Sequence, residues 1–332
     1  MADLLLIGAG FSRNWGGWLA TEAFEHLLGS PEFARDPGLR RLLWEHQERG
    51  GFEAALAELQ AQYAQDPGPA GGALMALQEA IKRMFDDMNA AFMAAADWQF
   101  GQQHIERQIS TFLTRFDAIF TLNQDVLLEH HYVNDNIALI GKKKWDGAEL
   151  PGMRRVPPQD PMHANLWSRS TWSPLAEDVF KVDTRFQPIY KLHGSSNWTR
   201  ADGQQLLIMG GAKVREIGQT PILNWYARVF EESLSAAGAK LMVIGYGFRD
   251  EHINAAIACA VKRGLKLFIV APEGAELARM LNPTRASDRI VARTPMEDMI
   301  EESLIGASRR GLREIFGHDV AEFGKVMRFF AA

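Results

Sequence analysis

Residues 4–12 read LLLIGAGFS, an apolar run that ends in a glycine turn. A continuous apolar run stopped by glycine is typical of a buried parallel strand, expected here over residues 3–8. Two further strings, TLNQD at 121–125 and KLHGSSNW at 191–198, place polar side chains directly after apolar stretches. The ends of strands are where open α/β sheets gather their ligands, so the three strings predict one shared site.

The rest of the chain alternates between strand and helix patterns. Helical spacing is evident at about 221–237 and 251–263. This alternation predicts an α/β fold with a Rossmann-like, doubly wound parallel sheet. The further strands are expected at 117–121, 188–192, 240–245 and 266–271, with short strands near 137–140 and 180–182 in an irregular region.

Apolar residues at three- and four-residue spacing predict a helical insertion over about 20–115. Asp66-Pro67-Gly68-Pro69 and the pair Gly71-Gly72 are expected to break the helices inside it. We therefore expect one α/β domain over 1–290 that contains the insertion, followed by a C-terminal helical segment over 291–332.

Composition limits the classes of function. The chain has 332 residues, 47% of them hydrophobic, and a net charge of −5, so no global basic field recruits nucleic acid. The one cysteine, Cys259, is expected to be a buried structural thiol in a cytoplasmic protein. The N-terminal apolar run has no basic leader, and no run reaches membrane-spanning length, so we expect a soluble protein without a membrane partner.

The glycine loop alone fits either a structural turn or a nucleotide loop. Gly8 and Gly10 follow a strand, but a dinucleotide fingerprint needs a third glycine where Arg13 stands. Ser12 and Arg13 are donors suited to a diphosphate. The following Asn14–Trp18 segment fits a mobile lid or plain aromatic packing.

Together and in this order, the strings resemble the sirtuin family, which cleaves the nicotinamide–ribose bond of NAD. Gly8–Ser12 matches the family's Gly-Ala-Gly-x-Ser, Asn123 and Asp125 match its Thr-Gln-Asn-x-Asp, and His193-Gly194 matches its His-Gly pair. Leu122 departs from the family's glutamine. VIGYGFRDEHIN at 243–254, like KLHGSSNW, resembles the bacterial sirtuin-like proteins of antiphage defence.

The resemblance implies two catalytic residues, with Asn123 holding ribose hydroxyls or a water and His193 acting as a base with a pKa near neutrality. Asp125 and Asp250 also fit helix caps. The residues implied to bind NAD are Gly8, Ala9, Gly10, Phe11, Ser12, Arg13, Asp125, Gly245, Tyr246, Gly247 and Phe248. No metal ligand is implied, and the remaining histidines show no metal-ligand spacing.

Deacylating sirtuins carry a zinc module with two Cys-x-x-Cys pairs, which one cysteine does not supply. Water then becomes the acceptor, and the resemblance implies an NAD⁺ hydrolase that releases nicotinamide and ADP-ribose, with NAD⁺ as substrate and no zinc. The family implies a toxic effector of antiphage defence that depletes NAD. It also implies a homo-oligomer or a separate sensor partner, either a hexameric DNA-translocase ATPase or an Argonaute-type protein, and no sequence-specific nucleic-acid binding by this chain.

Two alternatives stay open. One is an ADP-ribosyl transferase or deacylase that uses the same NAD chemistry on a macromolecule. The other is a non-catalytic module that binds NAD or ADP-ribose and regulates a partner.

Overall fold

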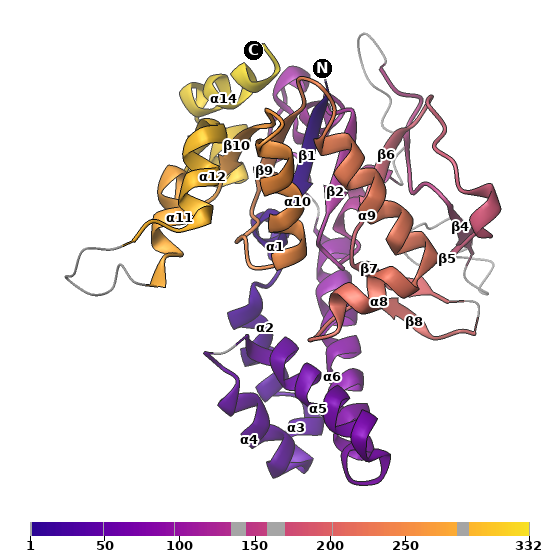
Figure 1. Ribbon diagram of the computed structural model, residues 1–332. Helices are drawn as coiled ribbons and strands as arrows, with labels where there is room; N and C mark the ends of the chain where they lie inside the picture. The colour runs from indigo at the N-terminus through magenta and orange to yellow at the C-terminus, as the bar shows by residue number, and fades with distance from the viewer. Residues whose placement is uncertain are drawn as a thin grey trace.

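The computed structural model describes residues 2–48, 50–95, 97–133, 144–157, 170–200, 202–283 and 292–331. Within these residues a parallel sheet has the strand order β11-β10-β9-β1-β2-β6-β3 (Figure 1). Its strands are β1 Asp3–Ile7, β2 Ala118–Thr121, β3 Ala148–Glu149, β6 Gln187–Lys191, β9 Lys240–Ile244, β10 Lys266–Val270 and β11 Leu304–Ser308. The expected Rossmann-like α/β fold is confirmed.

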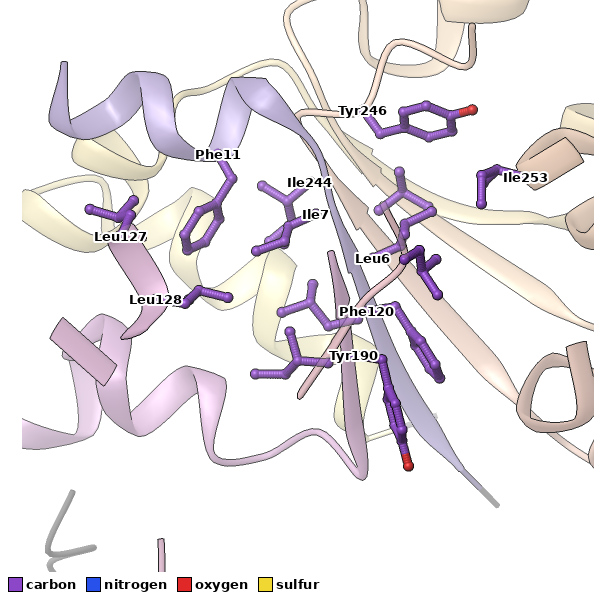
Figure 2. Packing of buried hydrophobic residues seen from close by; sticks show 14 of the residues in the cluster. Leu6, Ile7, Phe11, Phe120, Leu127, Leu128, Tyr190, Ile244, Tyr246 and Ile253 are labelled. Atoms are coloured by element: carbon purple, nitrogen blue, oxygen red, sulfur yellow. The ribbon is translucent and has the colours of Figure 1, made fainter. Parts of the chain in front are cut away.

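The central strands are buried on both faces, as their apolar runs predict. Side chains alternate between the faces, so Leu6 packs with Phe120, while Ile7 lies on the opposite face toward Phe11 (Figure 2). Phe120 stacks on Tyr190 of the neighbouring strand, with ring centroids 5.0 Å apart. These side-chain contacts add to the strand pairing that holds β1, β2 and β6 together.

Helices cover the sheet and connect its strands. In the view of Figure 1, α9 Pro221–Leu234 and α10 Glu251–Val261 lie in front of the sheet. They occupy the stretches for which helical spacing predicted helices. The shorter helical elements are α1 Ala9–Ser12, α7 Ile109–Leu113, α8 Lys213–Gln219, α11 Leu277–Met280 and a π-helical turn at Glu129–Val133.

The helical insertion lies below the sheet in Figure 1. The break at Asp66-Pro67 is confirmed, since Pro67 opens a helix and the Asp66 side chain accepts from the Gly68 amide. The expected break at Gly71-Gly72 is wrong, because both glycines lie inside α6. The helices of the insertion are α2 Ala20–Leu28, α3 Pro31–Arg35, α4 Pro37–Glu45, α5 Gly51–Gln65 and α6 Pro67–Ala94.

A second, four-stranded sheet has the order β4-β5-β7-β8. The strand expected at 180–182 is wrong: a 3₁₀ turn ends at Val179, and Phe180 stacks on Trp225 with ring centroids 5.1 Å apart. The strand expected at 137–140 lies outside the described residues. The strands of this sheet are β4 Met153–Val156, β5 Thr171–Pro174, β7 Gly194–Thr199 and β8 Gln205–Leu207.

The C-terminal segment contains the expected helices and also an unexpected strand. Its helices are α12 Pro295–Ser303, α13 Leu312–Gly317 and α14 Val320–Met327. Between the first two, β11 adds to the edge of the main sheet beside β10. A five-residue stretch with a central glycine, Gly306, carries too weak a pattern to predict this strand.

Candidate active site

The site lies at the carboxyl ends of β1, β2, β6 and β9. Ile7 pairs in register with Thr121 on one side and with Ile244 on the other, and Thr121 pairs with Lys191. The loops that follow these strands therefore begin at the same height. The chain also changes sides here, since β9 lies across β1 from β2 and β6, and such a switch point is where open α/β sheets bind ligands.

Two glycine loops touch each other at this edge. The amides of Gly8 and Gly10 donate to the carbonyls of Ile244 (3.0 Å) and Gly245 (2.9 Å). A Cβ on Gly10 would lie 2.7 Å from the Gly245 Cα, and a Cβ on Gly245 would lie 2.3 Å from the Phe11 nitrogen. The glycines thus allow the loops after β1 and β9 to come into contact. The amides of Gly8 and Gly10 both donate hydrogen bonds within the protein.

The other residues of the first loop differ in their exposure to solvent. Ala9 is exposed, while Phe11 is fully buried and packs against Trp15 with ring centroids 5.1 Å apart. The exposed Arg13 pairs with Glu22 of the insertion. Trp15 stacks on Trp98 at 4.4 Å, so of the two readings of this segment the structure favours aromatic packing over a lid.

Ser12, Asn123 and Asp125 form a buried hydrogen-bonded cluster. The Asn123 amide donates to Ser12 Oγ (2.9 Å), and Ser12 Oγ donates to Asp125 Oδ2 (2.8 Å). The other Asp125 oxygen accepts from the Leu127 amide at 3.0 Å, which is the capping contact expected of it. The structure therefore brings the first two sequence strings together through side chains.

A buried ion pair, Lys191 with Glu129, contacts this cluster through the backbone of Asp125. Lys191 Nζ donates to Glu129 Oε1 (2.6 Å) and to the Asp125 carbonyl (2.5 Å). Both side chains are at most 2% exposed, and burial raises the pKa of Glu129 although Lys191 opposes the shift. With Ser12 and Asn123 they line a small cavity at the end of β1. The pair fixes the loop that carries Asn123 and Asp125.

His193 follows β6 at the height at which Asn123 follows β2, since Thr121 pairs with Lys191 and each residue stands two positions further on. Gln124 links the two loops, because its side chain donates to the carbonyls of Ile208 (2.6 Å) and His193 (3.3 Å). The second and third strings therefore meet on adjacent strands.

His193 Nε2 lies 3.1 Å from Nε2 of His252, at the start of α10. Burial lowers the pKa of His193 to about 3, with Lys213 and His252 acting in the same direction and Asp250 against it. The expected pKa near neutrality is therefore wrong, because the ring is only 3% exposed. Burial also lowers the pKa of His252, so both rings are neutral at neutral pH.

An ion-pair chain adjoins the two histidines. Lys213 Nζ contacts Asp250 Oδ1 at 3.1 Å and Glu53 of α5 at 2.6 Å. Although burial opposes ionisation of Asp250, Lys213 and the neighbouring histidines hold the pKa of Asp250 below its usual value. Asp250 stands at the N-cap of α10 as expected, but its side chain bonds to Lys213 and not to the helix amides.

The loop after β9 is held in a strained turn. Phe248 has φ of 51°, in the left-handed region that few non-glycine residues adopt. The Asn254 side chain donates to the Phe248 carbonyl (2.9 Å), and the Tyr246 hydroxyl accepts from the Asp250 amide (3.1 Å). Both aromatic rings are buried and stack at 4.9 Å, whereas Gly247 and Arg249 of the same loop are exposed.

A family model of the SIR2-like domain matches residues 117–284, half of the chain. The chain belongs to the SIR2-like domain family. Membership is consistent with an NAD-using enzyme of the sirtuin superfamily. The comparison with curated proteins returned no match.

The match to the SIR2-like domain includes Asn123, His193 and the loop after β9, but it begins after the first glycine loop. The structure joins that loop to the SIR2-like residues through the paired β1 and the Ser12 contacts. Along the described parts of the chain, no helix is both long and apolar enough to cross a membrane.

Several residues beside the site were not predicted from the sequence. They are Glu53, Glu129, Lys191, Lys213 and His252, and each meets its partner across a long separation in the chain. The Asp-x-His spacing of 250 and 252 was the one local signal for His252. Cys259 is exposed, so its expected burial is wrong.

Proposed function

We propose that this SIR2-like domain hydrolyses NAD⁺ at the nicotinamide–ribose bond to give nicotinamide and ADP-ribose. The observation that carries the proposal is the convergence of Asn123 and His193 at equal heights on the adjacent strands β2 and β6. Membership in the SIR2-like domain family supports NAD as the substrate. The anchored loops after β1 and β9 border the same edge of the sheet.

In the proposed reaction the bond from the ribose anomeric carbon to the nicotinamide nitrogen breaks, through a state with oxocarbenium character. Asn123 holds the ribose hydroxyls or the attacking water. Its orientation is set by Ser12, which in turn is bonded to Asp125. Neutral His193 accepts the proton that the water loses as its oxygen bonds to the anomeric carbon. The nicotinamide leaves as the neutral base.

Water is the proposed acceptor for two reasons. The chain has one cysteine, so its residues do not supply the two Cys-x-x-Cys pairs of the deacylases' zinc module. Directly after His193 the chain forms β7 of the second sheet. Both observations favour hydrolysis over transfer to an acyl-lysine substrate.

The decisive experiment follows NAD labelled in its ADP-ribose part, with purified protein and in lysate of expressing cells. We expect free labelled ADP-ribose and nicotinamide from the wild type. Asn123→Ala and His193→Ala should each lower the rate by about 10²–10⁴-fold, the range for loss of a general base or comparable group. His318→Ala is the matched control, since His318 is exposed.

Full activity in both site variants would refute the assignment of these residues. Label retained on protein or nucleic acid would show a transferase. Tight NAD binding without turnover in either setting would show a binding module.

We further propose that the activity serves antiphage defence by depleting NAD, and that a homo-oligomer or a separate sensor partner controls it in the cytoplasm. The resemblance of the strings around His193 and Gly245 to bacterial defence proteins supports this role. Expression of the wild type should lower cellular NAD and arrest growth when the system is triggered, and His193→Ala should do neither. An unchanged NAD pool during triggered arrest would contradict the role.

A further inference from the structure

His193, Asp250 and His252 bring three metal-ligating groups to one point. One ligand atom from each residue lies within 4.8 Å of the other two. They come from two segments, the turn after β6 and the start of α10, which the fold holds together. This cluster is unrelated to the four-cysteine zinc module of deacylases, whose ligands the chain does not supply.

The spacing of the two imidazoles matches a shared metal ion. Their Nε2 atoms are 3.1 Å apart. Zn–N distances of about 2.0–2.1 Å place two nitrogens on a tetrahedral ion about 3.3 Å apart, so a small movement accommodates the ion. Two imidazoles and one carboxylate suit zinc and similar transition metals, whereas magnesium and calcium prefer oxygen ligands.

The charges around the cluster also favour a cation. Lys213 is the ammonium beside Asp250, but it is paired with Glu53 as well. The two carboxylates and one ammonium leave a net negative charge next to two neutral rings.

We propose that His193, His252 and Asp250 bind one divalent transition-metal ion, best matched by Zn²⁺, and that the ion inhibits the hydrolase. The inhibitory part rests on the proposed function, because the ion occupies Nε2 of the residue that accepts the proton. Metal binding itself does not depend on any turnover of NAD.

The test is a calorimetric titration of ZnCl₂ into tag-free, EDTA-treated full chain, repeated with Co²⁺ as a spectroscopic probe and with Mg²⁺. We expect one Zn²⁺ per chain, visible Co²⁺ bands typical of four-coordinate geometry, and no Mg²⁺ binding. His252→Ala should weaken Zn²⁺ binding by more than about tenfold, since it removes a direct ligand. His104→Ala, a change at an exposed histidine outside the cluster, should bind like the wild type.

Circular dichroism establishes that each variant is folded, and Asp250→Asn is the second ligand variant if His252→Ala does not fold. Equal Zn²⁺ affinity in the wild type and a folded ligand variant, or no binding by the wild type, would overturn the site. In the activity arm, Zn²⁺ should suppress nicotinamide release by the wild type and EDTA should restore it. Activity that requires Zn²⁺ would overturn the inhibitory role. A chain inactive toward NAD both as purified protein and in lysate of triggered cells would refute the proposed function, while the titration still decides the site.

Discussion

At the scale of single residues, buried charge organises this site more than exposed charge does. Lys191 and Glu129 are both nearly inaccessible to water, and Lys191 also bonds to the backbone carbonyl of Asp125. Desolvating such a pair is costly, and losing one member leaves the other unpaired in the core. The pair therefore constrains the Asn123 loop strongly while contributing little net stability.

We expect Lys191→Met to lower the free energy of unfolding by about 3–5 kcal/mol, because it leaves the buried Glu129 carboxyl without its cationic partner. The double variant Lys191→Met/Glu129→Leu should lose clearly less, since it removes both charges. Lys144→Met is the matched control: its partner Asp117 is 37% exposed, and such surface pairs contribute about 0–1 kcal/mol. Urea unfolding at pH 7 measures all three variants, and a double variant that loses as much stability as Lys191→Met, or more, would contradict this account.

At the scale of elements, the carboxyl ends of β1 and β9 depend on two loops in direct contact. Gly245 has φ of 65°, and a Cβ there would meet the Phe11 nitrogen. From the sequence alone the glycines of the first loop fit either a structural turn or a nucleotide loop. In the structure they make room for the second loop, a contact that no local pattern reveals.

Gly245→Ala should destabilise the protein by at least about 3 kcal/mol, because a left-handed backbone and a backbone clash combine. Gly264→Ala separates the two causes, since Gly264 has φ of 99° but nothing within 4 Å of its added Cβ. That control should cost about 1–2 kcal/mol from backbone conformation alone. Thermal unfolding compares the two variants, and equal losses would show that the contact between the loops is unimportant.

At the scale of the whole molecule, the C-terminal segment completes the fold. β11 pairs with β10, the Leu312 amide donates to Asn14 Oδ1 (2.9 Å), and Lys240 Nζ donates to the Phe329 carbonyl (2.6 Å). Asn14 lies in the segment just after the first glycine loop. The contact with Asn14 therefore lies beside the site, whereas Lys240 begins β9 and its contact with Phe329 lies at the opposite edge of the sheet.

A chain that ends at Thr294 should fail to fold stably. It exposes the edge of β10 and loses buried side chains such as Phe316 and Phe329, each contributing about 1.5–3 kcal/mol against a typical total stability of 5–15 kcal/mol. A chain that ends at Phe330 is the control and should melt like the full chain. Size-exclusion chromatography and circular dichroism decide the outcome, and a monomeric shorter chain with a cooperative melt would show that the segment is dispensable.

The sequence by itself determined the sheet and the three strings at its edge. Continuous apolar runs of this length are typical of strands buried inside a parallel sheet. The strands that precede Gly8, Asn123 and His193 could therefore be predicted. Parallel strands in register then required their polar ends to meet. The short strand β11 and the pairing of the second sheet left too little pattern in the chain to be predicted.

Only the tertiary structure decided what surrounds those residues. His193 and His252 are 59 positions apart, and the Lys191–Glu129 pair is separated by 62. Such contacts depend on how the helices pack on the sheet, and no periodicity in the sequence predicts this packing. Burial follows from the same docking, and it lowers the pKa of His193 far below the value of a free imidazole. The sequence therefore located the strings that carry Asn123 and His193, while the partners of these residues and the burial of His193 were set by packing.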